Sequence, residues 1–263
     1  MHVEKWVELK SGGAFVIHHR ELPKSVSFAY AWAPVTVHEY WKFVKSDAFS
    51  DSAVWKDAPD SVSKSMASLS SHIQGQMRHP NRPVTWVSLY GALAFCAWKT
   101  MGRSDGRFIR LPQTAEWRKL LTASQIDREL LDAKEWPSGE KALFNWRGAG
   151  IGYPTPVGAF PLKVSGATDV LGNVWEWLSP SKGEPYHTFD DHQNRSESFP
   201  VGGGAYNTSL NPPDKSIAVP PPEFTTNGYE AIGFRCVISD VELDLKAVLS
   251  RLRADRRPRA ERK

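Results

Sequence analysis

The stretch Asp169-Val170-Leu171-Gly172-Asn173-Val174-Trp175-Glu176-Trp177 decides the fold of this 263-residue chain. Two tryptophans flank Glu176, so we expect this carboxylate to be at least partly buried. A buried carboxylate needs a cation or several hydrogen-bond donors beside it. The stretch therefore predicts that a charged or strongly polar partner is held at this place.

Two further segments follow it, Gly202-Gly203-Gly204-Ala205-Tyr206 and Gly233-Phe234-Arg235-Cys236. In this order the three segments resemble the formylglycine-generating enzyme family, also described as the sulfatase-modifying-factor domain. The resemblance implies an α+β fold, a loop-rich variant of the C-type-lectin fold, over residues 1–238. Residues 239–263 would then be an appended helix and a basic tail.

The composition is that of an ordinary globular protein, with 41% hydrophobic and 24% charged residues. No apolar run reaches the roughly 18 residues that cross a bilayer. The N-terminus lacks the cationic-then-apolar order of a secretion signal, so we expect a cytoplasmic protein. Two cysteines are too few for a disulfide framework.

The formal net charge of +4 is unevenly distributed. Residues 251–263 carry seven Lys or Arg and two acidic residues, so the rest of the chain sums to −1. A basic tail on a near-neutral body can bind nucleic acid or another anionic surface. A solvated chain end is the alternative interpretation of the same tail.

The chain also shows periodic segments that predict secondary structure. Residues 6–10 and 14–17 read as two strands around a glycine turn, residues 36–44 as a helix capped by Thr36, and residues 83–98 as a second helix. A further helix is expected after Pro112, with Thr114 as its candidate cap. Residues 47–82 are polar and poorly periodic, so we expect a variable loop there.

Residues 240–252 have the pattern of an amphipathic helix. One stripe carries the apolar residues Val241, Leu245, Val248, Leu249 and Leu252. Such a helix would cover its own domain, pair with a copy of itself, or dock on a protein or peptide partner.

The resemblance implies a calcium site. Its ligands would be Asp169, the carbonyls of Gly172 and Val174, and Glu176. Two carboxylates joined by a bent backbone offer the oxygen ligands that calcium prefers. The alternative is that Glu176 accepts hydrogen bonds from backbone amides and that no metal binds.

Members of the family oxidise a substrate cysteine with two thiols of their own, which bind copper. The resemblance aligns these two positions with Thr208 and Pro213. Neither side chain can bind copper(I), so copper and cysteine-to-formylglycine oxidation are not expected.

The two cysteines of the chain, Cys96 and Cys236, match other family positions that lie close together. We expect them to be neighbouring thiols. In a reducing compartment they would be buried and free rather than bonded.

Other branches of the family use iron. The candidate ligands here are His187, Asp190, Asp191 and His192, because imidazoles and carboxylates suit non-haem iron. The alternative is a solvated polar loop. Tyr206 is a further candidate for a catalytic role.

Finally, five residues would edge the groove that the family uses for substrates: Trp175, Trp177, Tyr206, Asn207 and Thr208. Such a groove suits an extended peptide or a flat ligand. We therefore expect a catalytically diverged protein that binds a protein or peptide. The alternative is an oxidoreductase that works without those thiols, with non-haem iron.

Overall fold

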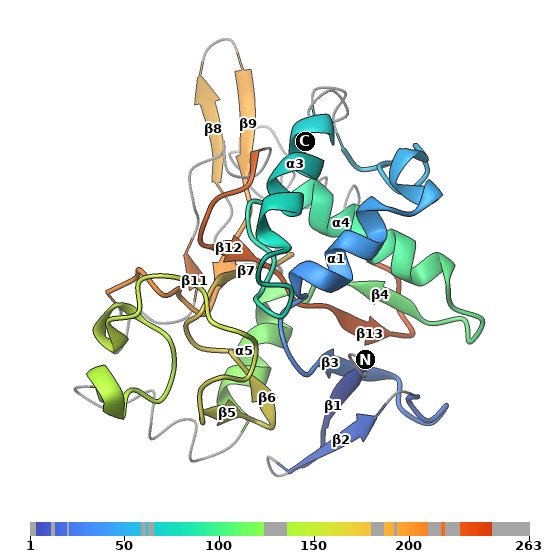
Figure 1. Ribbon diagram of the computed structural model, residues 1–263. Helices are drawn as coiled ribbons and strands as arrows, with labels where there is room; N and C mark the ends of the chain where they lie inside the picture. Colours follow the sequence, from blue (N-terminus) through green and yellow to red (C-terminus); the bar gives the residue numbers. More distant parts are fainter. Residues whose placement is uncertain are drawn as a thin grey trace, which may run out of the picture.

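The computed structural model describes residues 4–11, 14–19, 21–58, 62, 66–123, 136–179, 187–191, 194–209, 217–218 and 227–243. A five-stranded antiparallel sheet has the order β2-β1-β3-β13-β4. Its strands are β1 (Lys5–Leu9), β2 (Phe15–His19), β3 (Phe28–Ala31), β4 (Phe108–Arg110) and β13 (Val237–Ser239). Figure 1 shows this sheet at the lower right, with α1 and α4 above it.

A second sheet is built around the stretch 169–177. Its order is β11-β10-β7-β12, with β7 (Trp175–Trp177), β10 (Val201–Gly202), β11 (Ile217–Ala218) and β12 (Ile232–Gly233). β12 runs parallel to β7, whereas β10 runs antiparallel to it. The three segments that carried the family resemblance therefore lie side by side in one sheet.

Two hairpins complete the strands. They pair β5 (Lys163–Val164) with β6 (Ala167–Thr168), and β8 (His187–Asp191) with β9 (Asn194–Ser198). The β8–β9 hairpin projects at the top of Figure 1.

The helices are α1 (Val37–Val44), α3 (Met66–Gln76), α4 (Leu89–Met101) and α5 (Thr114–Thr122), with short 3₁₀ turns η2 (Asp47–Ser50), η3 (Gly139–Lys141) and η4 (Arg147–Ala149). None of the helices in the described part of the chain combines the length and apolarity needed to cross a membrane. The mixture of helices and two sheets confirms the predicted α+β class.

The start of α1 agrees with the sequence prediction. The Glu39 amide donates to Thr36 Oγ1 over 3.3 Å, and Thr36 N donates to Glu39 Oε2 over 2.9 Å. These reciprocal bonds satisfy two backbone N–H groups at the helix N-terminus. The helix then buries Tyr40 and Phe43, and the Tyr40 ring stacks on Phe95 of α4 at a centroid distance of 5.7 Å.

The next two helical segments differ from their predictions. The helix predicted over 83–98 begins only at Leu89, where Ser88 caps it. Before Ser88 the chain is not helical, and Trp86 has a left-handed backbone. The expected loop 47–82 contains α3, whose Ile73 is fully buried. Packing against α1, rather than a periodic sequence, stabilises α3.

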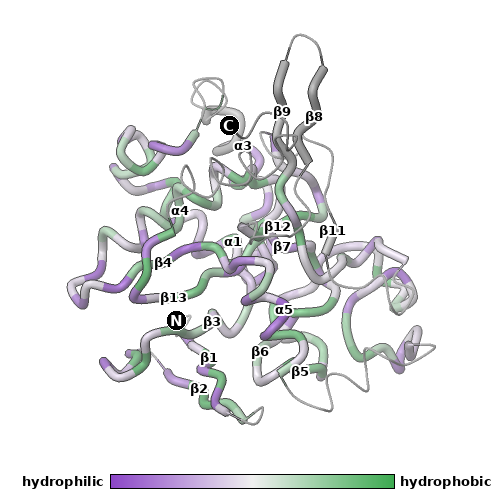
Figure 2. The backbone as a smooth tube through the Cα atoms, turned by 180° about the vertical axis from the view of Figure 1, so that it is seen from behind, coloured by the Kyte–Doolittle hydropathy of each residue, from purple (hydrophilic) through white to green (hydrophobic). Residues whose placement is uncertain are grey.

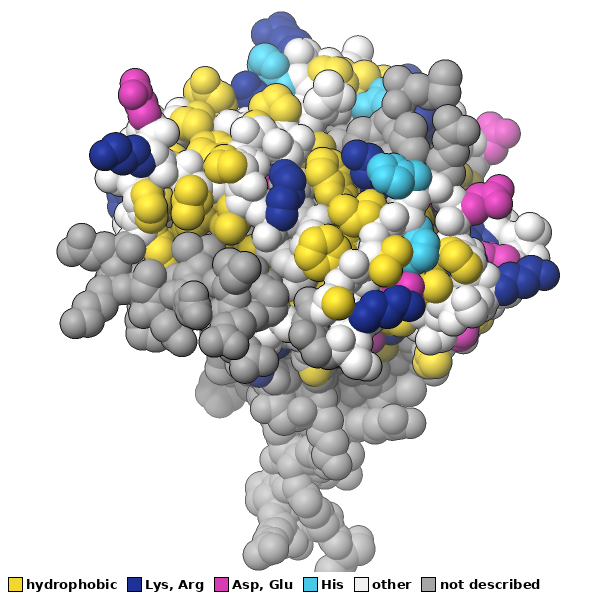
Figure 3. Space-filling model, turned by 90° about the horizontal axis from the view of Figure 1, so that it is seen from below, with side chains coloured by type: hydrophobic (Ala, Val, Ile, Leu, Met, Phe, Trp, Pro, Cys, Tyr) yellow, Lys and Arg dark blue, Asp and Glu magenta, His cyan; other side chains and the backbone are white. Residues whose placement is uncertain are grey.

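β2 is an edge of the five-stranded sheet; its first three residues are hydrophobic and its last two are histidines. Figure 2 colours the chain by hydropathy. Phe15 is 45% exposed, and Val16 and Ile17 are exposed as well. On the face seen from below, hydrophobic side chains alternate with Lys, Arg and His rather than forming one basic field (Figure 3).

Residues 240–243 follow β13 without forming helix. The predicted helix 240–252 therefore does not begin at residue 240. The rest of that segment and the basic tail 251–263 lie outside the described residues.

We expect the Glu176→Gln substitution to cost about 3–5 kcal/mol of unfolding free energy, because it leaves the buried guanidinium of Arg235 without a counter-charge. Urea unfolding measures this cost. The matched control is Glu242→Gln, which removes an exposed ion pair with Lys56 and should change stability by no more than about 0.5 kcal/mol. Equal effects of the two variants would contradict a central role for the Glu176–Arg235 pair.

Candidate functional site

The centre of the region is a fully buried ion pair between Glu176 and Arg235. Arg235 Nε lies 2.7 Å from Glu176 Oε2, and Nη2 lies 2.6 Å from Oε1. The same guanidinium donates to the carbonyls of Thr168 and Ala31. Burial raises the pKa of the Glu176 carboxyl, and Arg235 opposes that rise. The partner predicted for this buried carboxylate is therefore an arginine of the last glycine segment.

Beside this pair, Asn173 connects the loops that surround the site. Its Oδ1 accepts from the amide of Thr155 at 2.9 Å and from Asn145 Nδ2 at 3.2 Å. Its backbone carbonyl accepts from the Tyr206 amide at 3.1 Å. Gly172 before it has φ +73°, and a Cβ there would lie 2.3 Å from the Asn145 carbonyl oxygen. Only glycine allows this close approach.

Thr208 lies where the resemblance aligns the first family thiol. Its hydroxyl oxygen accepts two hydrogen bonds, from Trp175 Nε1 at 3.1 Å and from the Ala205 amide at 3.2 Å. Thr208 is partly exposed, and Asn207 and Ser209 on either side of it are exposed. The hydroxyl thus holds the turn and the Trp175 indole in place.

The five predicted groove residues are not equivalent. Trp175 and Thr208 are partly exposed and Asn207 is exposed, whereas Tyr206 is only 8% exposed and packs with Trp175, Ala205 and Ala231. Trp177 is fully buried, and its indole N–H donates to the Val87 carbonyl at 2.9 Å. Trp177 therefore belongs to the core and cannot line a groove, which corrects the expectation.

Tyr206 is a poor candidate for proton transfer. Burial raises the pKa of its phenol, and the nearby Glu230 and Tyr229 raise it further. The phenol therefore stays protonated at neutral pH.

The sequence interpretation missed an aromatic row that continues this surface. The Trp86 ring lies 5.6 Å from the His72 ring and 6.3 Å from the Tyr229 ring. Tyr229 packs in turn against the cluster of Trp175 and Tyr206. No periodicity marks these residues in the sequence, because they come from α3, from the segment before α4 and from the segment before β12.

Trp86 is the most unusual member of this row. The backbone of Trp86 is left-handed, with a φ of +58°. The residue is 37% exposed. Its amide donates to the Tyr229 carbonyl at 3.0 Å, and a Cβ on Gly228 would lie 2.6 Å from the Trp86 carbonyl carbon. A bulky residue in this conformation costs on the order of 1–3 kcal/mol, which is typical of functional positions.

The predicted calcium ligands do not fit that ion as they are arranged here. Both oxygens of Glu176 are bound by Arg235, so a cation at Glu176 would lie next to a guanidinium. Asp169 Oδ2 accepts from the Gly158 amide at 2.7 Å, and Oδ1 accepts from Asn173 Nδ2. Burial raises the pKa of Asp169, and the Gly158 amide and the charge of Arg235 oppose the rise. The carbonyls of Gly172 and Val174 remain predicted ligands that no observation here supports.

The sulfur atoms of Cys96 and Cys236 lie 3.8 Å apart, and both residues are buried free thiols. The neighbouring Cys96 and burial raise the pKa of Cys236, which disfavours its reactive thiolate form. Cys96 belongs to α4, and Cys236 directly precedes β13.

The predicted iron ligands do not form the expected loop. His187, Asp190 and Asp191 belong to β8, whose backbone is extended and pairs with β9. A strand of this length separates its ends by about 13 Å, so His187 and Asp191 cannot share one ion. His192 lies outside the described residues. Among the residues that the structure describes, no three His, Cys, Asp or Glu residues form a metal-binding group.

Residues 11–240 match the family model of the sulfatase-modifying factor enzyme 1-like domain. The chain therefore belongs to this family. A solved structure, the crystal structure of CarF, superposes with a TM-score of 0.53 over 80% of this chain and 85% of that chain, at 17% sequence identity. This likeness shows a shared fold.

Two curated relatives have activities in their names. Hercynine oxygenase of Mycolicibacterium thermoresistibile is 35% identical over 133 residues, covering 48% of this chain and 27% of the relative. Formylglycine-generating enzyme of Mycobacterium tuberculosis is 31% identical over 117 residues, covering 41% and 36%. The match thus spans between a quarter and two fifths of the length of these relatives.

We expect millimolar calcium to leave the melting temperature of the chelator-treated protein unchanged, because Arg235 occupies the Glu176 oxygens. A site of micromolar affinity would instead stabilise the fold by about 4 kcal/mol in millimolar calcium. Differential scanning calorimetry with calcium, and with magnesium as the control, makes the measurement. A clear rise in calcium alone would show that the ion displaces Arg235.

Substitutions at Trp86 should reveal its backbone strain. Trp86→Ala and Trp86→Gly remove the same ring contacts, but only glycine relieves the left-handed conformation, so the glycine variant should be more stable by about 1 kcal/mol. The control pair Met101→Ala and Met101→Gly lies at an exposed helical position, where alanine should be the more stable. The same order at both positions would exclude strain at Trp86.

Proposed function

We propose that this protein is a catalytically diverged member of its family that binds an extended peptide segment of a partner protein. The binding surface is the row of Trp175, Tyr206, Asn207 and Thr208, continued by Trp86. Cysteine-to-formylglycine oxidation is not part of its activity.

The observation that carries the proposal is the environment of Thr208. The chain has two cysteines, both buried beside each other, and neither belongs to this turn. Thr208 has a structural role instead, since its hydroxyl accepts from Trp175 and Ala205. A side chain that fixes an indole at a surface suits binding better than oxidation.

The aromatic residues support a peptide as the ligand. Aromatic rings offer large contact area at a low cost in side-chain entropy and are enriched at interaction sites. The exposed Asn207 and Ser209 next to them supply hydrogen bonds to a peptide backbone.

The test is selection of peptides from a random display library by the purified chain, followed by fluorescence polarisation with the enriched peptides. Asn207→Trp places a bulky ring on the exposed turn, so it should weaken binding at least about tenfold. The control Met101→Trp adds the same ring to an exposed position of α4 and should bind normally. Enrichment of no peptide, or equal binding by both variants, would overturn the proposal.

A second candidate is an oxidoreductase that needs no thiol, which the similarity to a hercynine oxygenase favours. Its metal would be iron. At least one iron ligand would come from outside the strand residues His187, Asp190 and Asp191. This second candidate predicts stoichiometric iron in the purified protein and oxygen consumption above that of free iron. Absence of both in the iron-loaded protein would remove this candidate.

A further inference from the structure

A small pocket lies beside the aromatic row. It has a volume of about 100 Å³ and lies between the end of α3 and the segment that precedes α4. Its lining is formed by Val37, Gln76, His79, Arg82, Pro83, Thr85 and Pro154. Nothing in the proposed function so far uses it.

The notable group in this pocket is Arg82. Its Nε is buried and has no hydrogen-bond partner among the residues that the structure describes. The guanidinium carbon lies 4.7 Å from the centre of the Tyr153 ring, and that ring is 52% exposed. Stacking on the ring orients the guanidinium, but the ring is no substitute for an oxygen as acceptor of its N–H groups. Arg82 as a whole is partly exposed, but a buried N–H donor without an acceptor is unfavourable, so this N–H group is available to a ligand oxygen.

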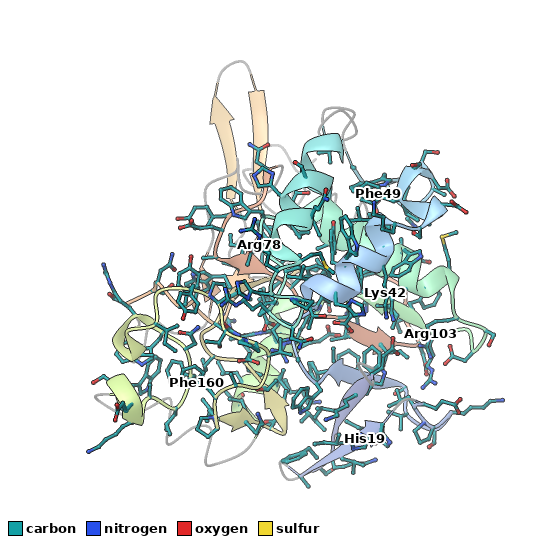
Figure 4. All side chains as sticks on the ribbon, in the orientation of Figure 1. His19, Lys42, Phe49, Arg78, Arg103 and Phe160 are labelled. Carbon is teal, nitrogen blue, oxygen red and sulfur yellow. The ribbon has the colours of Figure 1, made fainter. Side chains whose placement is uncertain are left out.

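The neighbours of Arg82 cannot supply that acceptor. The side chain of Gln76 is already used, because its Oε1 accepts from the Thr85 amide at 3.0 Å and its Nε2 donates to the Thr85 carbonyl at 2.9 Å. His79 and Arg78 are exposed, and neither brings a negative charge to Arg82. Figure 4 labels Arg78. Within the described part of the chain, no carboxylate lies within ion-pair distance of Arg82.

The pocket and the aromatic row share the same two segments. Gln76 lines the pocket one helical turn after His72, which contacts Trp86. Thr85 lines the pocket and directly precedes Trp86. The exposed Trp86 ring, held in a costly backbone conformation, is therefore adjacent to a pocket that offers a positive donor.

We propose that this pocket is a subsite for the carboxylate of an acidic residue, Asp or Glu, in the bound peptide. The carboxylate accepts hydrogen bonds from Arg82, and a neighbouring residue of the same peptide packs on Trp86. Arg82 is suited to this role because a planar guanidinium binds a carboxylate through two N–H groups. The inference rests on the proposed function, since it names the chemistry of the peptide.

The first test uses an array of peptides in which every acidic peptide has a twin with Asn in place of Asp or Gln in place of Glu. The wild-type protein should bind acidic peptides about tenfold or more better than their twins. Arg82→Gln should abolish this difference while retaining the weaker binding of the twins. Lys119→Gln removes an exposed charge from α5 and should leave the difference intact. No acidic preference, or a preference that survives Arg82→Gln, would overturn the inference.

A second measurement separates this inference from the proposed function. Acetate is titrated into the ¹⁵N-labelled protein, and the Nε–H resonance of Arg82 is followed, assigned by its loss in Arg82→Gln. A saturable shift at Arg82, absent at the exposed Arg78, supports a carboxylate site even if no peptide binds. Peptide binding without any shift at Arg82 would leave the proposed function standing and refute the subsite. A buried water that satisfies Nε would give the same negative result.

Discussion

The rest of the structure depends on one interaction, the buried ion pair of Glu176 and Arg235. Glu176 lies in the central strand of the second sheet, and Arg235 lies between the last strand of that sheet and the last strand of the first. The guanidinium also binds the carbonyl of Ala31 in β3. One side chain therefore ties the two sheets together in a place without water, where each charge would be unfavourable without the other.

The ion pair also sets what the neighbouring loops can do. Gly172 and Asn173 belong to the same stretch as Glu176. Their backbone contacts hold the turn that carries Tyr206 and Thr208. In this protein the turn is stabilised by a threonine hydroxyl, and a hydroxyl fixed by two donors has no redox chemistry. The scaffold thus supplies a rigid surface, and the residues placed on it decide the function.

Much of the fold could be predicted, because caps, alternating strands and the family segments are local signals. The candidate site could be predicted only in part. The stretch 169–177 indicated a buried Glu176 but not the identity of its partner, and it did not reveal that Trp177 lies in the core. Trp86 and Arg82 escaped notice because their roles come from a left-handed backbone and an unmatched donor, which tertiary contacts create and which leave no pattern in the sequence.

The order of the first sheet has a consequence for synthesis of the chain. β13, at residues 237–239, inserts between β3 and β4, so an inner strand of the sheet is the last of its strands to be made. Until it emerges from the ribosome, β3 and β4 have no partner on their facing edges, and Arg235 has not yet reached Glu176. The two sheets can therefore be completed only after residue 239 has been translated, and such pairing of strands far apart in the sequence favours slow folding.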